Sequence, residues 1–318
     1  MSMAELSPHA AAFLQEEAVS RPTVGDAEIC RAALRRNSAI ISGEPPTVAT
    51  IRDYVIDGDT PVPVRIYNEP SKGSSPVIVY FHGGGFVIGD LDTVDTLCRH
   101  LALAASCVVV SVDYRLAPEY PYPAAISDSD SVVRWILGGG LASCDTTRLA
   151  LGGDSAGANL ATVTALRMRD RGEAAAVNFL AYPFVDLRVD SRPSRVRYGQ
   201  GYGLDGEMID WYKSCYLPSE DLSKSPFVSP VCANLKGLPH TLIMTAECDP
   251  LRDQGEDYGR LLANAGVTVT LVCYAGELHG FLRAISVTPA ASAAISQIAS
   301  TVKRSWNLGA HIEYGLHE

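Results

Sequence analysis

Residues 153–157 read Gly153-Asp154-Ser155-Ala156-Gly157 and fit the pattern G-x-S-x-G. The apolar run at 148–152 predicts a buried strand, and residues 158–166 predict a helix. A serine on a sharp turn between a strand and a helix has a strained backbone and an exposed hydroxyl. The flanking glycines let the strand and the helix pass closely. The pattern therefore predicts Ser155 as a nucleophile, and the alternative is an ordinary tight turn.

A nucleophilic serine needs a base, and the base needs an acid that orients it. In the chain order typical of such a turn, the acid and then the histidine follow the serine. His279 lies past the predicted strand at 267–274, where a loop can bring its imidazole to the serine proton. Asp249 follows the predicted strand at 241–246 and can accept a hydrogen bond from that imidazole.

Other residues compete for both roles, and each candidate also has a plainer interpretation. His279 could be an ordinary loop histidine, and Asp249 a turn or helix-capping aspartate. The rival bases are His82, His240, His311 and His317, and the rival acids are Glu247 and Asp253.

A glycine-rich segment, His82-Gly83-Gly84-Gly85-Phe86, directly follows the predicted strand at 77–81. Successive glycines let the backbone approach a substrate and leave its N–H groups pointing at one place. With the N–H of Ala156, those of Gly83 and Gly84 can hold the oxyanion of a tetrahedral intermediate. The alternative is a flexible glycine turn, since the segment has neither G-x-G-x-x-G nor a P-loop pattern.

Short apolar strands alternate with helices from residue 77 onward, which predicts a mostly parallel sheet flanked by helices on both faces. Ligands bind such sheets at the carboxyl ends of the strands. Residues 186–233 break the alternation with one predicted helix, at 206–216, and such an insertion can form a lid. Residues 1–45 are predicted to be helical, and 48–56 with 63–67 to form a hairpin. The predicted strands are 77–81, 107–112, 149–152, 177–182, 241–246 and 267–274, and the other helices are 93–105, 125–137, 156–171, 253–265 and 290–306.

The composition is that of a globular chain, with 318 residues, 47% apolar residues and a net charge of −10. Such a charge argues against a nucleic-acid partner and against binding to anionic membranes. No apolar run approaches the roughly 18 residues of a spanning helix. A signal peptide begins with a basic segment, whereas no lysine or arginine precedes Arg21 here. We therefore expect a cytoplasmic protein without a membrane partner. The eight cysteines show no C-x-x-C spacing and H-E-x-x-H is absent, so no metal or cofactor is expected.

Five motifs in order along the chain resemble those of the hormone-sensitive-lipase-like (bacterial family IV) carboxylesterases. The resemblance spans residues 45–305 and implies an α/β-hydrolase fold with a helical cap. It also implies a triad of Ser155, Asp249 and His279, unlike the plant gibberellin receptors, which resemble this family without its catalytic histidine. It supports the same oxyanion hole of Gly83, Gly84 and Ala156. The motifs are His82-Gly83-Gly84-Gly85, Tyr114-Arg115-Leu116-Ala117-Pro118-Glu119, Gly153-Asp154-Ser155-Ala156-Gly157, Asp249-Pro250-Leu251-Arg252-Asp253 and His279-Gly280-Phe281.

In this family the cap combines an N-terminal helical segment with an insertion after the sixth strand. The resemblance thus places the cap at 1–45 and 186–233, and the catalytic domain at 46–185 and 234–318. Edge strands pair in this family, which allows a homodimer. Large apolar side chains are candidate walls of the substrate pocket, with simple packing as the alternative. These candidates are Phe13, Phe86, Tyr202, Leu204 and Trp211.

Together the residues and the resemblance predict a serine carboxylesterase that hydrolyses short- to medium-chain esters through an acyl-enzyme. Charges at 186–197, where interfacial lipases have an apolar lid, favour a dissolved small-molecule ester. An amidase or N-deacylase with the same triad, and a non-catalytic small-molecule binder, stay open as alternatives. Arg115 and Glu119 are predicted to form a structural polar network, and Asp154 to hydrogen-bond neighbouring loops.

Overall fold

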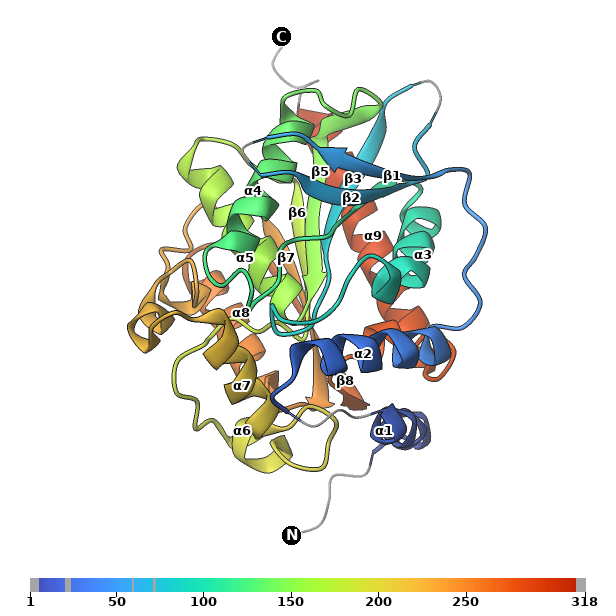
Figure 1. Ribbon diagram of the computed structural model, residues 1–318. Coiled ribbons are helices and arrows are strands. Elements are labelled where there is room, and N and C mark those ends of the chain that lie inside the picture. The colour runs from blue at the N-terminus through green and yellow to red at the C-terminus, as the bar shows by residue number, and fades with distance from the viewer. Residues whose placement is uncertain (1–5, 21–23, 59, 71–72, 313–318) are drawn as a thin grey trace.

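The computed structural model describes residues 6–20, 24–58, 60–70 and 73–312, which are built around one eight-stranded sheet (Figure 1). The strand order is β1-β2-β4-β3-β5-β6-β7-β8. The β1–β2 and β2–β4 pairs are antiparallel and the others parallel, which confirms the predicted hairpin and the mostly parallel sheet. The strands are β1 (Ile51–Ile56), β2 (Val62–Tyr67), β3 (Ser75–Phe81), β4 (Val108–Val112), β5 (Cys144–Asp154), β6 (Val177–Ala181), β7 (His240–Cys248) and β8 (Val269–Leu278).

Helices cover both faces of the sheet, because the central strands are apolar on both sides. In β3, Val77 and Val79 pack into the core that α4, α5 and α8 close, whereas Ile78 and Tyr80 pack toward α3 and α9. The sheet is therefore a rigid middle layer whose carboxyl edge can hold side chains in fixed positions. These helices are α3 (Asp95–Ala105), α4 (Ala124–Leu137), α5 (Ala156–Asp170), α8 (Arg252–Asn264) and α9 (Pro289–Ile312).

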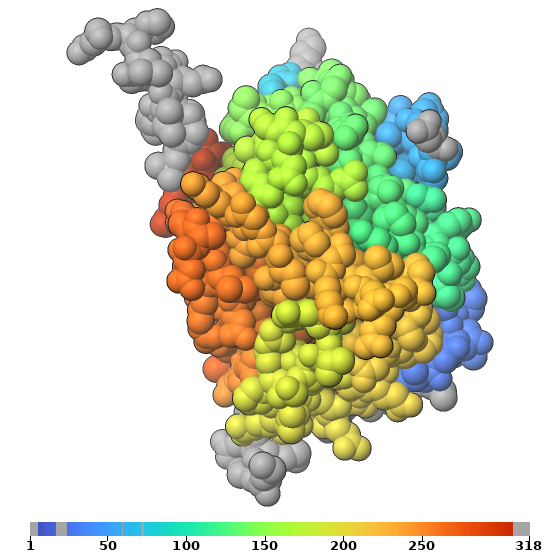
Figure 2. All heavy atoms as spheres, turned by 90° about the vertical axis from the view of Figure 1, so that its left-hand side faces the viewer, coloured from blue at the N-terminus to red at the C-terminus, as the bar shows by residue number. Residues whose placement is uncertain are grey.

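A second group of helices lies at one end of the sheet, below the strands in Figure 1. It contains α1 (Pro8–Ser20) and α2 (Ala27–Ile41) from the N-terminal segment, and α6 (Pro193–Tyr198) and α7 (Gly206–Tyr216) from the insertion. On the face shown in Figure 2, the yellow and gold surface of residues 186–233 covers the lower part of the molecule. Two segments far apart in the sequence thus meet at the same end of the sheet.

Among the elements that differ from the sequence-based predictions are β5 and α6. Strand β5 begins at Cys144 rather than at residue 149. Residues 145–148 are polar and half-buried or exposed, so they give no apolar signal. Helix α6 was not predicted, since six residues are too short to show a helical period, although Pro193 is typical of a first turn. The predicted helix at 206–216 coincides with α7.

Candidate active site

Ser155 lies between the end of β5 at Asp154 and the start of α5 at Ala156, as the pattern predicts. Its backbone has φ 54° and ψ −116°, a combination that a residue with a side chain rarely adopts. Hydrogen bonds on both sides of Ser155 stabilise this strained turn. The Ser155 N–H donates to the Ala181 carbonyl at 2.9 Å, and the Phe184 N–H donates to the Ser155 carbonyl at 3.1 Å. The strained turn presents the hydroxyl at the carboxyl edge of the sheet.

The glycines beside Ser155 are required by close backbone contact. A Cβ atom on Gly157 would lie 1.9 Å from the Phe81 carbonyl oxygen, and one on Gly153 would lie 2.5 Å from that same oxygen. Both distances are far below van der Waals contact. The end of β3 and the start of α5 therefore approach each other as closely as they do only because neither residue has a side chain.

Replacing Gly157 by Ala is expected to lower the free energy of unfolding by about 3 kcal/mol or more, since a backbone oxygen cannot move aside as a side chain can. Urea unfolding followed by circular dichroism measures this change. Gly172→Ala is the matched control: Gly172 has φ 78°, but nothing lies within 4 Å of its would-be Cβ, so only about 1 kcal/mol of backbone strain is expected. Equal losses in the two variants would contradict the close-contact explanation.

Ser155, His279 and Asp249 form a continuous hydrogen-bonded chain. His279 Nε2 lies 3.0 Å from Ser155 Oγ, and His279 Nδ1 lies 2.8 Å from Asp249 Oδ2. Asp249 is fully buried, and its other oxygen accepts the Leu251 N–H at 2.7 Å. Because a carboxylate only accepts, Nδ1–H donates to Asp249 and leaves Nε2 to accept the serine proton.

Two strand ends position the histidine and the aspartate. Asp249 follows the last residue of β7, and His279 follows the last residue of β8, which pairs with β7 in parallel. The Tyr182 ring packs against the imidazole, with ring centroids 4.7 Å apart. The sheet itself therefore brings these residues together across 124 and 30 positions of sequence.

The rival candidates have other partners. His240 contacts Ser305 and Thr270, and His82 contacts the Gly83 carbonyl. The side chains of His311 and His317 lie outside the described part of the chain. Glu247 accepts the Gly276 N–H, and Asp253 pairs with Arg252. Within the described ranges, no group of three or more metal-ligating side chains occurs, and none of the helices is long and apolar enough to cross a bilayer.

The glycine-rich loop corrects one predicted residue of the oxyanion hole. The Gly83 N–H donates to Asp154 Oδ1 at 2.8 Å, so it points into the protein and is not available to a substrate oxygen. Gly84 and Gly85 both line the pocket at Ser155, with φ values of 120° and 62°. Among the described residues, nothing accepts a hydrogen bond from the N–H of Gly84, Gly85 or Ala156. Three adjacent glycines give no sign of which N–H groups are bonded within the protein, so sequence reasoning did not single out Gly85.

Comparison with known proteins decides the family. The model of a family with the α/β hydrolase fold matches residues 78–283, well over half of the chain. The chain belongs to this family.

Relatives and solved structures cover most of this α/β hydrolase. It is 40% identical to the carboxylesterase NlhH of Mycobacterium tuberculosis over 292 residues, or 87% of this chain and 89% of that one. It is 35% identical to an ethyl acetate hydrolase of Pseudomonas putida, covering 94% of this chain and 99% of the relative. A crystal structure of an esterase from Pyrobaculum calidifontis matches with a TM-score of 0.89 and 38% identity, over 94% of this chain and 98% of that one.

Asp154 anchors the glycine loop of this α/β hydrolase to the sheet. Besides the Gly83 N–H, its Oδ1 accepts the Tyr80 hydroxyl at 2.8 Å, and its side chain is buried. Burial, reinforced by the Asp154 charge, raises the pKa of the Tyr80 phenol well above its ordinary value, so the hydroxyl stays protonated and donates. The prediction that Asp154 hydrogen-bonds a neighbouring loop is confirmed.

Arg115 and Glu119 both make structural contacts, but in two separate places. Arg115 forms a bidentate pair with the buried Asp128, with its closest distance at 2.7 Å. Glu119 instead accepts from Arg31 of α2, which also donates to the Val87 carbonyl at 2.9 Å. Arg31 therefore ties the N-terminal helical segment to the chain that follows the glycine loop. Arg115 and Glu119 are therefore both structural residues, as predicted, but they do not share one network.

A cavity of about 140 Å³ lies beside Ser155 and His279, and Leu204 alone of the five predicted wall residues lines it. Phe86 is buried against Tyr216, with ring centroids 3.9 Å apart, and Trp211 packs beside Tyr212. Phe13 and Tyr202 belong to a small buried cluster under α1 and α6. These four side chains pack against the protein, which corrects their prediction as pocket walls.

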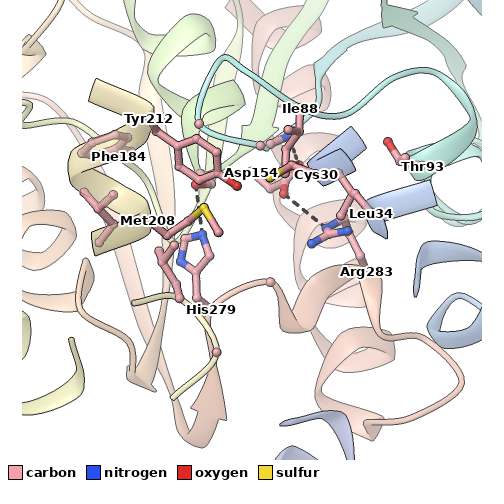
Figure 3. A pocket seen from close by; sticks show the side chains of 18 of the residues that line it. Cys30, Leu34, Ile88, Thr93, Asp154, Phe184, Met208, Tyr212, His279 and Arg283 are labelled. Atoms are coloured by element: carbon pink, nitrogen blue, oxygen red, sulfur yellow. Dashed lines mark hydrogen bonds and ion pairs between the residues drawn. The ribbon is translucent and has the colours of Figure 1, made fainter. Parts of the chain in front are cut away.

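The walls that sequence reasoning missed come largely from α2 and α7. Met208 and Tyr212 are four residues apart on α7 and both line the cavity, together with Phe184 after β6 (Figure 3). Their i, i+4 spacing could have indicated a shared helix face, but not which cavity that face meets.

Proposed function

We propose that this chain, a carboxylic ester hydrolase of the α/β-hydrolase family, cleaves short-chain esters through an acyl-enzyme on Ser155. The observation that supports this most directly is the chain of contacts from Asp249 Oδ2 through His279 to Ser155 Oγ, at 2.8 and 3.0 Å. The relatives named as carboxylesterase and ethyl acetate hydrolase support the ester class.

In the proposed mechanism, Ser155 Oγ attacks the ester carbonyl while His279 Nε2 takes the hydroxyl proton. The N–H groups of Gly84, Gly85 and Ala156 hold the resulting oxyanion, and the positive end of α5 adds to this stabilisation. The C–O bond to the alcohol breaks, and His279 returns the proton to the leaving oxygen. Water then loses a proton to His279 and attacks the acyl-enzyme. The bond from the acyl carbon to Ser155 Oγ breaks, His279 returns its proton to Oγ, and the carboxylic acid is released.

We also propose that residues 1–45 and 186–233 form the cap that selects the substrate. The support is that α2 contributes Ala33 and Leu34 to the cavity, and α7 contributes Met208 and Tyr212. A cavity of about 140 Å³ is small beside the roughly 300–1,000 Å³ of pockets for drug-sized ligands. Short acyl chains fit this space without rearrangement of the helices.

We expect kcat/KM for p-nitrophenyl esters to be highest at acetate or butyrate and about tenfold or more lower at laurate, because a cavity of about 140 Å³ does not accommodate the longer chain. Initial rates across acetate, butyrate, octanoate and laurate measure this. Leu204→Ala, which enlarges the cavity, is expected to move the maximum toward longer chains. A maximum at laurate in the unmodified chain would overturn the short-chain proposal.

The same assay separates the alternatives. Comparison of p-nitrophenyl butyrate with the matching butyryl p-nitroanilide tests for an amidase, and ligand binding without any turnover would favour a non-catalytic binder. Homodimer formation and the absence of nucleic-acid and membrane partners stay predictions, as does a cytoplasmic location.

A further inference from the structure

The cavity beside Ser155 has chemically different sides (Figure 3). Phe184, Met208 and Tyr212 lie on the side of His279, whereas Arg283 lies on the other, near Leu34 of α2. Arg283 is the one arginine or lysine among the described lining residues. The cavity therefore has a polar side as well as an apolar one.

Arg283 is held at the cavity by contacts with Asp154 and Ser38. Its Nε lies 3.8 Å from Asp154 Oδ2, and its Nη1 donates to Ser38 Oγ of α2 at 3.3 Å. Its Nη2 lies 3.3 Å from where a Cβ on Gly280 would be, which places this nitrogen beside the residue that follows His279. A guanidinium has five N–H donors in a fixed fork, so it can keep these contacts and also donate to a substrate oxygen.

Asn37 supplies a second polar group to the same cavity. It precedes Ser38 on α2, its side chain is 5% exposed, and it lines the cavity. Its Oδ1 is buried and has no hydrogen-bond partner among the described residues. A buried acceptor without a donor is costly, and a ligand that brings a donor removes that cost.

The charge balance decides what kind of ligand fits. Asp154 offsets the charge of Arg283, so the cavity does not carry the net positive charge that would favour a carboxylate. A hydroxyl group matches both partners, because it can donate to Asn37 Oδ1 and accept from Arg283 at the same time.

We propose that Arg283 and Asn37 bind a hydroxyl group on the substrate, so that the preferred esters carry a neutral hydroxyl on the acyl or the alcohol part. This inference rests on the proposed ester hydrolysis at Ser155 and names the substrate class of that site.

Matched esters that differ by hydroxyl against methyl test the inference. On the acyl side the pair is ethyl 3-hydroxybutyrate and ethyl 3-methylbutyrate, and on the alcohol side it is 2-hydroxyethyl butyrate and propyl butyrate. The readout is the ratio of kcat/KM for the hydroxyl ester to that for its methyl partner. In one of the two pairs, this ratio is expected to fall about tenfold in Arg283→Met and, separately, about tenfold in Asn37→Leu. This is the loss expected for a hydrogen bond to a buried group.

Arg260→Met, at an exposed arginine of α8, is the matched control and should leave both ratios unchanged. If Arg283→Met and Asn37→Leu lower kcat/KM equally for both esters of each pair, the two residues have a structural role only and the inference is overturned. A larger loss with ethyl hydrogen succinate than with either hydroxyl ester would also overturn it, because it would indicate a carboxylate site.

A binding measurement separates this inference from the proposed mechanism. In the Ser155→Ala protein, calorimetry should show the hydroxyl ester binding about tenfold more tightly than its methyl partner, and Arg283→Met should remove the difference. This result is independent of turnover. If the unmodified chain hydrolyses no ester but the affinity difference persists, the mechanism fails and the hydroxyl site stands.

Discussion

Replacement of Ser155 by Ala is expected to lower kcat for p-nitrophenyl butyrate by about 10⁵-fold or more, with little change in the free energy of unfolding. The variant removes the only atom that bonds to the acyl group in the proposed mechanism. What remains is the contribution of the Gly84, Gly85 and Ala156 amides to a direct attack by water. Initial rates at saturating ester, together with thermal unfolding to confirm the fold, measure the effect.

The three residues are also expected to act as a unit. Ser155→Ala combined with His279→Ala should be about as slow as Ser155→Ala alone, since the base has no proton to take once the hydroxyl is gone. His240→Ala is the control, because His240 contacts Ser305 and Thr270 and lies outside the site. Additive losses in the double variant would show that His279 acts independently of Ser155 and would contradict the proposed roles.

The second large effect is expected at Asp249. Asp249→Asn should lower kcat by about 10⁴-fold, as loss of the orienting carboxylate does in other serine hydrolases. Asp249 is fully buried and accepts Nδ1–H of His279 at 2.8 Å. An amide removes the charge that stabilises the imidazolium, and its NH₂ group favours the tautomer with the proton on Nε2, which cannot accept from Ser155.

Two nearby carboxylates provide matched controls for this variant. Glu247→Gln removes a charge at the end of the same strand, where Glu247 accepts the Gly276 N–H at 2.8 Å. Asp253→Asn removes a charge at the start of α8, where Asp253 pairs with Arg252. Both controls should keep kcat within about threefold of the original, since neither carboxylate touches the imidazole. If kcat fell as much in Glu247→Gln as in Asp249→Asn, the assignment of Asp249 as the residue that orients His279 would be contradicted.

Short-range patterns in the sequence were enough to predict most of the fold and the hydrogen-bonded chain at Ser155. The strands β3, β4 and β6 are largely apolar on both faces, and a short apolar run predicts a buried strand without knowledge of the segments around it. The turn at Ser155 is determined by five consecutive residues, because the glycines permit a contact that no other residue allows. Asp249 and His279 follow parallel strands directly, and parallel strands end at one edge of a sheet.

The tertiary structure alone decided which backbone amides of the glycine-rich loop are bonded within the protein and which side chains line the cavity. Gly83, Gly84 and Gly85 are identical in sequence terms, and only the position of Asp154 shows that the first of them donates into the protein. Phe86 is as apolar as Tyr212, yet its stacking on Tyr216 removes it from the cavity. Arg283 and Asn37 line the same cavity because α2 packs against the segment that follows β8, where Arg283 donates to Ser38. Contacts of this kind depend on how helices from distant segments pack, and that packing has no local signature in the chain.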